Sequence, residues 1–218
     1  MEAVPFGACG NRFIKISTGM NKVLYVFVAF FMLQMGAFAQ TNFEELTLAK
    51  ALEKAKAENK LVFVDTYTSW CMPCKYMANT IFPKSEMGEY LNPRFVCVKF
   101  NTEEGEGAEI MKRYEISAFP TFLILNTKGE VQHRIVGGSE TVEDFIKRVA
   151  EGLDEDKAIG ILAVKYEKGD RDVKLLVKYA RALLTVDDPL TVQVANELIS
   201  KLNDSQRVDS AYWFIYEH

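Results

Sequence analysis

Apolar side chains recur along the chain with two different periods, which predict alternating helices and strands as far as about residue 152. Residues 42–59 carry apolar side chains about every 3.6 positions, as an amphipathic helix does. Leu61-Val62-Phe63-Val64 follows as an unbroken apolar run. Such a run is typical of a strand buried on both faces, and this strand should end near Asp65.

The same patterns predict more of both elements. Further strands are expected at residues 95–100, 121–125 and 130–136. Further helices are expected after Asp65, at residues 107–114, and from Ser139 or Thr141 to about Gly152. Helices between the early strands require parallel pairing, whereas the turn at 126–129 makes the last two strands an antiparallel hairpin. The order therefore predicts an α/β fold with a mixed central sheet flanked by helices.

No strand pattern remains beyond residue 154. Helices are predicted at residues 157–168, 173–186, 190–202 and 205–217. Paired helices of this length resemble helical-hairpin repeats, so we expect a helical-hairpin extension over 154–218 after a domain over 40–153. The chain stops at an apolar stretch, 212–216, which must bury its face on the preceding hairpin, on a partner or on repeats missing here.

The first 39 residues predict a leader and a secretory signal peptide. The apolar run Val23–Phe38 follows Lys22 and leads to Ala37-Phe38-Ala39, a small-x-small cleavage site before Gln40. This apolar run of about 16 residues falls short of the roughly 20 that span a bilayer as a helix, which disfavours an uncleaved anchor. We expect translation to start at Met20 and the mature protein to be exported, either periplasmic or secreted.

Composition and charge narrow the range of functions. The chain has 218 residues, 49% of them hydrophobic and 26% charged, which argues against disorder and against a polytopic membrane protein. Loss of residues 1–39 removes three basic residues and one acidic residue, leaving 23 basic and 29 acidic and a formal net charge of −6. A chain with this excess of acidic residues does not indicate the basic surface that nucleic acids and anionic membranes bind, so neither is an expected partner.

Two of the three remaining cysteines, Cys71 and Cys74, are spaced i, i+3 where a helix should begin. A helix N-terminus favours thiolate over thiol, so Cys71 is the candidate nucleophile, with its sulfur outward, and Cys74 the more shielded resolving thiol. A zinc pair and an inert disulfide are the alternatives. Zinc requires two more ligands, and Cys97, His133 and His218 lie at no ligand spacing. Cys97 should be inert in the core, and His133 should face solvent or a sheet edge.

Several stretches, in this order, resemble the thioredoxin family over about residues 42–152. Trp70-Cys71-Met72-Pro73-Cys74-Lys75 resembles its active site, and Val62-Phe63-Val64-Asp65 resembles its central strand with a buried acid. Phe119-Pro120-Thr121-Phe122 resembles its cis-proline loop, and Gly137-Gly138 looks like the glycine pair closing its last strand. The resemblance implies a thioredoxin fold followed by the helical extension.

The resemblance also implies roles for individual residues. Asp65, with its pKa raised by burial, would relay a proton from Cys74, and Lys99 would lie near that acid. A satisfied core carboxylate and a solvated strand lysine are the alternatives. A cis Pro120 would present the backbone of Phe119 to a substrate peptide. Tyr67 would border this surface or simply pack, and the expected substrate-binding set is Trp70, Met72, Pro73, Phe119 and Pro120.

Two departures from the family pattern matter. Met72 stands where glycine is common, and because the dipeptide between the cysteines governs the redox potential, the direction of electron flow is not predicted. The segment over residues 80–94 is longer than the corresponding segment of a minimal thioredoxin. In this it resembles the secreted and periplasmic branch of the thioredoxin-like family.

These patterns predict a thiol-disulfide oxidoreductase that reduces or exchanges disulfides in exported proteins. Its partners would be protein disulfides or dithiols and a membrane-borne electron donor, and it would need no cofactor beyond the Cys71–Cys74 pair. The alternatives are oxidation or isomerisation by the same pair, and a binding platform whose helical tail recruits a partner.

Overall fold

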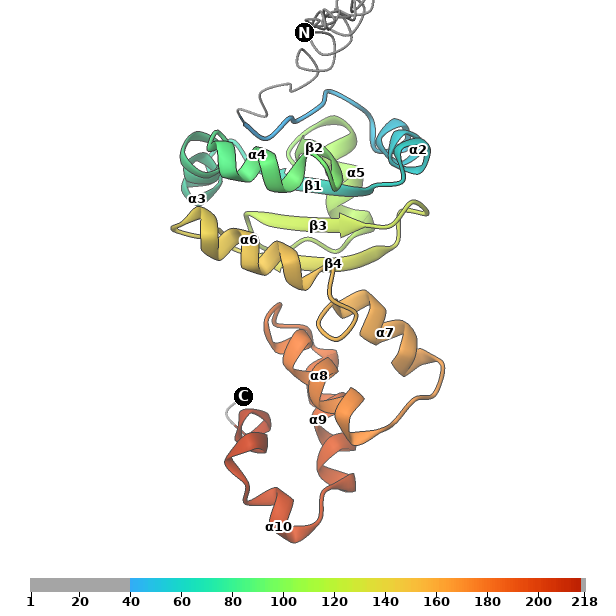
Figure 1. The fold of residues 1–218 in the computed structure, drawn as a ribbon. Coiled ribbons are helices and arrows are strands. Elements are labelled where there is room, and N and C mark those ends of the chain that lie inside the picture. Colours follow the sequence, from blue (N-terminus) through green and yellow to red (C-terminus); the bar gives the residue numbers. More distant parts are fainter. Residues whose placement is uncertain (1–39, 217–218) are drawn as a thin grey trace, which may run out of the picture. The chain divides into compact units, whose positions relative to one another are not determined.

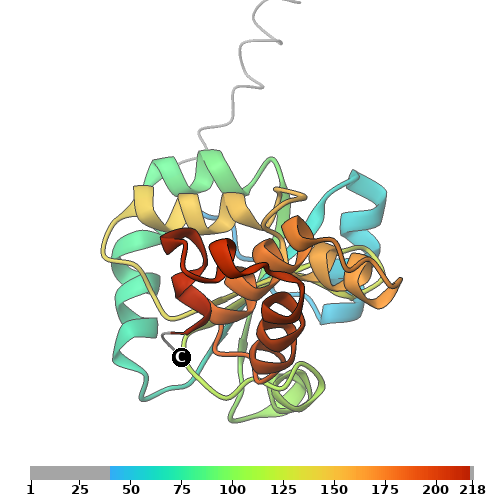
Figure 2. The same ribbon diagram turned by 90° about the horizontal axis from the view of Figure 1, so that it is seen from below.

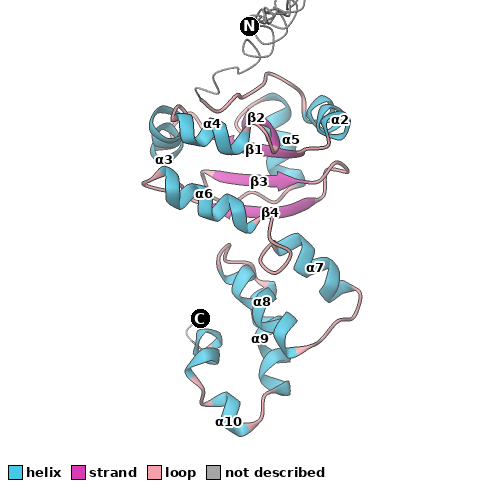
Figure 3. Cartoon of the chain, viewed as in Figure 1, coloured by secondary structure: helices cyan, strands magenta, loops and turns pink. Residues whose placement is uncertain are grey.

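The computed structural model describes residues 40–216, so the predicted leader and most of the cleavage site lie outside the described residues. A four-stranded sheet lies at the centre of the fold (Figures 1 and 3). Its strands are β1 (Leu61–Tyr67), β2 (Phe95–Asn101), β3 (Thr121–Leu125) and β4 (Val131–Val136). The spatial order is β2-β1-β3-β4, with β1 and β2 parallel and the other pairs antiparallel. The predicted mixed sheet is confirmed.

Helices cover both faces of the sheet (Figure 1). One face packs against α2 (Leu48–Glu58) and α5 (Gly105–Arg113). The other packs against η1 (Met77–Ile81), which continues α3 (Met72–Tyr76), and against α4 (Ser85–Leu91) and α6 (Val142–Glu151). Side chains alternate between the faces, so Val62 and Val64 enter the first core and Phe63 the second.

The second core is built largely from aromatic rings. Phe63 lies within 6.5 Å, between ring centroids, of five other phenylalanines, and Phe122 and Phe145 approach to 4.8 Å. Most of these contacts are edge-to-face, the geometry that the ring quadrupole favours. This core supports the side of β1 that faces η1 and α3, where the cysteine pair lies.

Two predicted boundaries are wrong. The first helix begins at Leu48 and not at residue 42, because the Thr47 side chain caps it by accepting the Lys50 N–H. The preceding residues are extended: Phe43 forms a parallel bridge with Cys97, and the Glu44 N–H donates to the Cys97 carbonyl at 2.8 Å. Strand β1 runs on to Tyr67, so Asp65 lies within the strand rather than at its end.

The helical extension has its own core. Its helices are α7 (Ile159–Glu167), α8 (Val173–Leu184), α9 (Leu190–Lys201) and α10 (Asp204–Arg207), followed by the 3₁₀ turn η2 (Ser210–Ile215). Figure 2 shows these segments, coloured orange to red, gathered together. The predicted single helix over 205–217 is wrong, because Asp209 caps a new turn by accepting the Ala211 N–H. Ile215 packs into the core, whereas Trp213 and Tyr216 stay more than half exposed. Over residues 40–216 no helix combines the length and the apolar character that crossing a bilayer requires.

Helix α7 packs closely on strand β4. A Cβ atom on Gly160 would lie 1.9 Å from the Val131 carbonyl oxygen, so only glycine fits there. The Ile159 N–H donates to His133 Nδ1 at 3.4 Å. His133 lies on the edge strand β4, one of the two positions predicted for it, but it is buried there, so the prediction that it faces solvent is wrong. Burial, with a contribution from Arg148, lowers its pKa to about 4 and keeps the ring neutral.

Candidate functional site

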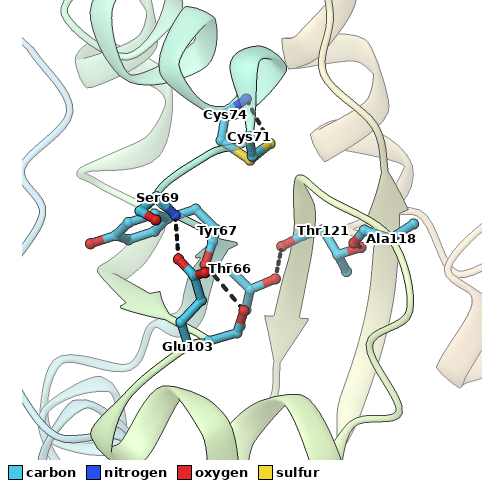
Figure 4. The surroundings of a disulfide bond; sticks show 9 residues. Thr66, Tyr67, Ser69, Cys71, Cys74, Glu103, Ala118 and Thr121 are labelled. Atoms are coloured by element: carbon cyan, nitrogen blue, oxygen red, sulfur yellow. Dashed lines mark hydrogen bonds between the residues drawn. A yellow bond between two sulfur atoms is a disulfide. The ribbon is translucent and has the colours of Figure 1, made fainter.

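Cys71 and Cys74 form a disulfide at the start of helix α3 (Figure 4). Their Cα atoms are 5.3 Å apart, within the range that a disulfide permits. Cys71 is the N-cap residue, and its Sγ accepts the Cys74 N–H at 3.1 Å. This N–H is among those that a helix leaves unpaired in its first turn. The same contact would stabilise a negative charge on Cys71 Sγ when the disulfide opens.

Both cysteines are shielded in this disulfide state. Cys71 is 3% exposed and Cys74 6% exposed, so the prediction that Cys71 is the more exposed of the two is wrong here. The side chains beside Cys71 point outward instead: Trp70 is 66% and Met72 69% exposed. Because burial does not distinguish the two sulfurs, their difference rests on the helix position of Cys71.

Asp65 lies on strand β1, buried beneath the helix that begins at Cys71. It lines a pocket of about 280 Å³ together with Ala78 and Phe82 from that helical segment, Thr41 and Lys99. Its Oδ1 is buried without a hydrogen-bond partner among the described residues. Burial raises the pKa of Asp65 to about 7, and the positive charge of Lys99 partly opposes that shift.

Lys99 stands directly opposite Asp65 in the parallel register of β1 and β2. It lies exposed at the mouth of the same pocket. The structure therefore brings the predicted acid and lysine together. A satisfied core carboxylate is the wrong description of Asp65, because one of its oxygens lacks a partner among residues 40–216.

The loop before strand β3 faces the exposed rings near the cysteines. The peptide bond between Phe119 and Pro120 is cis, as the sequence predicts. The Trp70 and Phe119 rings meet edge-to-face with centroids 6.2 Å apart. Within residues 40–216 neither the N–H nor the carbonyl of Phe119 has a hydrogen-bond partner. Pro73 is exposed next to Met72, while Pro120 itself is buried.

Threonine hydroxyls hold this loop to the neighbouring strands. Thr66 Oγ1 donates to the Thr121 carbonyl at 2.6 Å, and Thr121 Oγ1 donates to the Ala118 carbonyl at 2.8 Å (Figure 4). Because β1 carries Thr66 and leads into the cysteine helix, these bonds connect the proline loop with the segment that positions Cys71.

Two residues that support the site were not singled out from the sequence. Glu103, just after β2, accepts the Ser69 N–H at 2.7 Å and so fixes the segment before Trp70 (Figure 4). Hydrogen bonding from the Ser69 side chain, together with that backbone N–H, holds the pKa of Glu103 below its usual range. Arg134 on β4 donates to the carbonyl oxygens of Tyr114 and Glu115, at the start of the proline loop. The position of Glu103, a charged residue just after a parallel strand, could have identified it as part of the site. Nothing in the sequence around Arg134 indicates its role.

No group of three or more His, Cys, Asp and Glu side chains that could hold a metal ion occurs within residues 40–216. Cys97 is 1% exposed on β2, and burial raises the pKa of its thiol to about 12. A thiol with so high a pKa forms almost no thiolate at neutral pH, which makes it a poor nucleophile and a poor metal ligand. Cys97 therefore belongs to the core, as the sequence predicts.

Comparison with known proteins places residues 48–152 in a family described as a thioredoxin-like domain. Thioredoxin of Echinococcus granulosus is 31% identical over 90 residues, which cover 41% of this chain and 78% of that protein. The thiol:disulfide interchange protein DsbD of Pseudomonas fluorescens is 28% identical over 103 residues, covering 46% and 18% respectively. The chain spans less than two thirds of the length of several such relatives.

The chain is also similar to a solved structure. The solution structure of a putative disulphide-isomerase from Bacteroides thetaiotaomicron is 40% identical, with a TM-score of 0.48, and the match covers 53% of this chain and 95% of that one.

Proposed function

This chain belongs to the thioredoxin-like family, and we propose that it is a thiol-disulfide oxidoreductase that reduces or exchanges disulfides in exported proteins. The single observation that carries the proposal is the Cys71–Cys74 disulfide at the start of α3, with the Cys74 N–H directed at Cys71 Sγ. An inert structural disulfide would not need a buried acid with a pKa of about 7 beneath the same helix.

The first step uses the reduced pair. The Cys71 thiolate attacks one sulfur of the substrate disulfide, a new sulfur–sulfur bond forms, and the other substrate sulfur leaves as a thiolate. The Cys74 N–H in the first turn of α3 is directed at Cys71 Sγ and would stabilise the thiolate that attacks.

The second step releases the product. The Cys74 thiol gives its proton to the Asp65 carboxylate, and the resulting thiolate attacks Cys71 Sγ. The mixed disulfide breaks, the second substrate sulfur leaves as a thiolate, and the Cys71–Cys74 disulfide re-forms. Two electrons have then passed to the substrate. A carboxyl with a pKa of about 7 suits this role, because it can both accept and return a proton near neutral pH.

The substrate would bind as an extended peptide across the surface next to Cys71. Trp70, Met72 and Pro73 supply exposed apolar contacts, and Phe119 supplies an unpaired N–H and carbonyl. An extended peptide can satisfy those two groups with its own backbone, as an added strand does. Backbone recognition of this kind suits an enzyme that acts on many sequences.

Export and the electron donor complete the proposal. The signal-peptide pattern of residues 1–39 supports export, and the similarity to a thiol:disulfide interchange protein supports exchange with protein dithiols. Each turnover leaves the pair oxidised, so the cycle requires a dithiol donor, which we place in the membrane. Sequencing the N-terminus of the secreted protein tests export, since a mature N-terminus other than Gln40 would contradict cleavage after Ala39.

The decisive experiment is reduction of insulin by the purified protein supplied with a dithiol. Cys71→Ser should abolish the activity, and Cys97→Ala should leave it within about twofold of native, because Cys97 takes no part. Native activity in Cys71→Ser would refute the proposal. The reduction potential decides the direction, with about −270 mV indicating a reductase and about −120 mV an oxidant.

Substrates can be captured with Cys74→Ser. This variant can complete the first step but not the second, so its mixed disulfides should persist in the native compartment. We expect exported proteins joined to Cys71 that dithiothreitol releases. An absence of trapped proteins would favour a binding platform over an enzyme.

A further inference from the structure

A cleft of about 400 Å³ opens between the proline loop and the helical extension. We call it the extension cleft. It is lined by Glu115 and Ser117 from the loop, Arg134 from β4, Tyr179 from α8, and Asp187 and Asp188 from the turn between α8 and α9. The apolar part of its wall comes from α7 and the end of α8. The loop that leads to Pro120 and the helical extension therefore share the walls of one cleft.

The cleft shares the loop before Pro120 with the surface proposed to bind substrate, since Glu115 and Ser117 of that loop line it. Ser117 lies two residues before Phe119, and an extended chain spans at most about 3.3–3.6 Å per residue. Ser117, at the edge of the cleft, is thus at most about 7 Å along the chain from Phe119, which is the length of roughly two residues of an extended substrate. A substrate segment that pairs with the Phe119 backbone would reach the cleft within a few residues of its reacting cysteine.

The charge of the cleft is negative. Three carboxylates, from Glu115, Asp187 and Asp188, line it with one guanidinium, that of Arg134. Arg134 already donates to the carbonyls of Tyr114 and Glu115, so two of its nitrogen donors are in use. The acidic groups therefore outnumber the basic one by two, and Glu115 and Asp187 are both exposed to an incoming chain.

The phenol of Tyr179 lies next to these carboxylates. Tyr179 is almost fully buried, and its pKa is raised to about 12, first by burial and then by Asp188 and Glu167. A carboxylate raises the pKa of a nearby phenol because its negative charge disfavours the phenolate. A cation in this cleft would be stabilised by the same field.

We propose that the extension cleft is a specificity site that binds the polypeptide flanking the substrate disulfide and favours segments carrying lysine or arginine. The inference rests on the proposed function, because it assigns a substrate preference to that reaction. Under it, the helical extension selects substrates rather than supporting the chemistry, and its contribution is to KM rather than to kcat.

The test uses three peptides, each closed by the same disulfide and differing only in the residue three positions outside each cysteine: lysine, glutamine or glutamate. The enzyme variants are Glu115→Gln and Asp187→Asn, whose carboxylates make no hydrogen bond or ion pair with the described residues. Glu53→Gln on α2 removes the same charge outside the cleft and is the matched control. Asp188 is left intact because its Oδ1 caps α9 by accepting the Leu190 N–H.

The native enzyme should show a lower KM for the lysine peptide than for the glutamate peptide, by about two- to fivefold for each exposed charge pair. Each cleft variant should raise the KM for the lysine peptide by a similar factor, leave kcat unchanged, and leave the glutamine peptide unaffected. Glu53→Gln should behave as native. In 1 M salt, where the screening length falls to about 3 Å, the preference should vanish.

Equal KM values for the three peptides on the native enzyme would refute the inference, as would a preference that survives both cleft substitutions. A preference lost equally in Glu53→Gln would show an effect of net charge and would also refute it. Failure of the native enzyme to reduce any peptide would instead refute the proposed function, so the two failures are distinguishable.

Discussion

Replacement of Asp65 by asparagine should change the pH dependence of stability in a calculable way. The pKa of Asp65 rises from 3.8 to about 7 on folding, because burial disfavours the carboxylate. The folded protein therefore holds this proton at pH values where the unfolded chain has released it. Stability should fall as the pH rises from about 4 through 7, and the penalty should be complete above 7.

The size of the penalty follows from the shift. At about 1.36 kcal/mol per pKa unit, a rise from 3.8 to about 7 corresponds to about 4 kcal/mol. The asparagine side chain of Asp65→Asn would carry no charge and would escape this penalty. Its amide would lack a partner where Asp65 Oδ1 already lacks one, at about 1–3 kcal/mol, but that cost does not vary with pH.

Urea unfolding of the oxidised protein at several pH values from 4.5 to 8.5 measures the effect. The stability of Asp65→Asn relative to native should increase by about 3 kcal/mol across this range, most steeply between pH 5 and 7, because about 1 kcal/mol of the penalty is already present at pH 4.5. Asp144→Asn is the control, because hydrogen bonds from Thr141 and Lys147 lower the pKa of Asp144. The stability that this lowered pKa contributes is lost only as the pH falls below about 4, outside the measured range, so the effect of Asp144→Asn should be nearly constant with pH. A stability difference for Asp65→Asn that is constant with pH would refute the reasoning.

Three further predictions concern packing and reactivity. Gly160→Ala should lower the free energy of unfolding by about 1–3 kcal/mol, because its Cβ would meet the Val131 carbonyl; an unchanged urea midpoint would contradict the contact. Phe145→Ala should cost about 3–5 kcal/mol by the same assay, since the ring is fully buried among phenylalanines; a cost below about 1 kcal/mol would contradict that packing. Cys97 should resist iodoacetamide in the folded protein at pH 8 and react once urea unfolds it, as mass spectrometry would show; labelling of the native protein would contradict its burial and its pKa of about 12.

The sheet was predictable because its signals are local. Apolar runs and the turn at 126–129 placed all four strands to within three residues at each end, and β3 was predicted without error. The first helix was misplaced because residues 42–47 share its apolar period, and only tertiary pairing of Phe43 with Cys97 makes them extended. Periodicity alone could not separate these two outcomes.

The reactive residues were predictable where they lie close together in the sequence, as Cys71 and Cys74 do. The errors lie where segments far apart in the chain meet. The alternating pattern around His133 is that of an edge strand with one face in solvent. No residue nearby in the sequence indicates that Ile159 will cover the histidine. Likewise, Arg134 supports the proline loop through carbonyl groups 19 and 20 positions earlier, which leave no trace in the residue pattern.

The bridge at Phe43 and the packing of α7 on β4 have a shared consequence for encounters with unfolded polypeptides. The outermost strands of a sheet normally offer unpaired amides as a template on which foreign strands add and aggregate. Here Phe43 and Glu44 occupy part of that template on β2, and Gly160 brings α7 against β4. Both outer strands are thereby partly closed to a foreign strand. Under the proposed function, the backbone of Phe119 then offers a substrate strand the open N–H and carbonyl groups that lie beside the disulfide, so that strand pairing would place the substrate next to the reacting sulfurs.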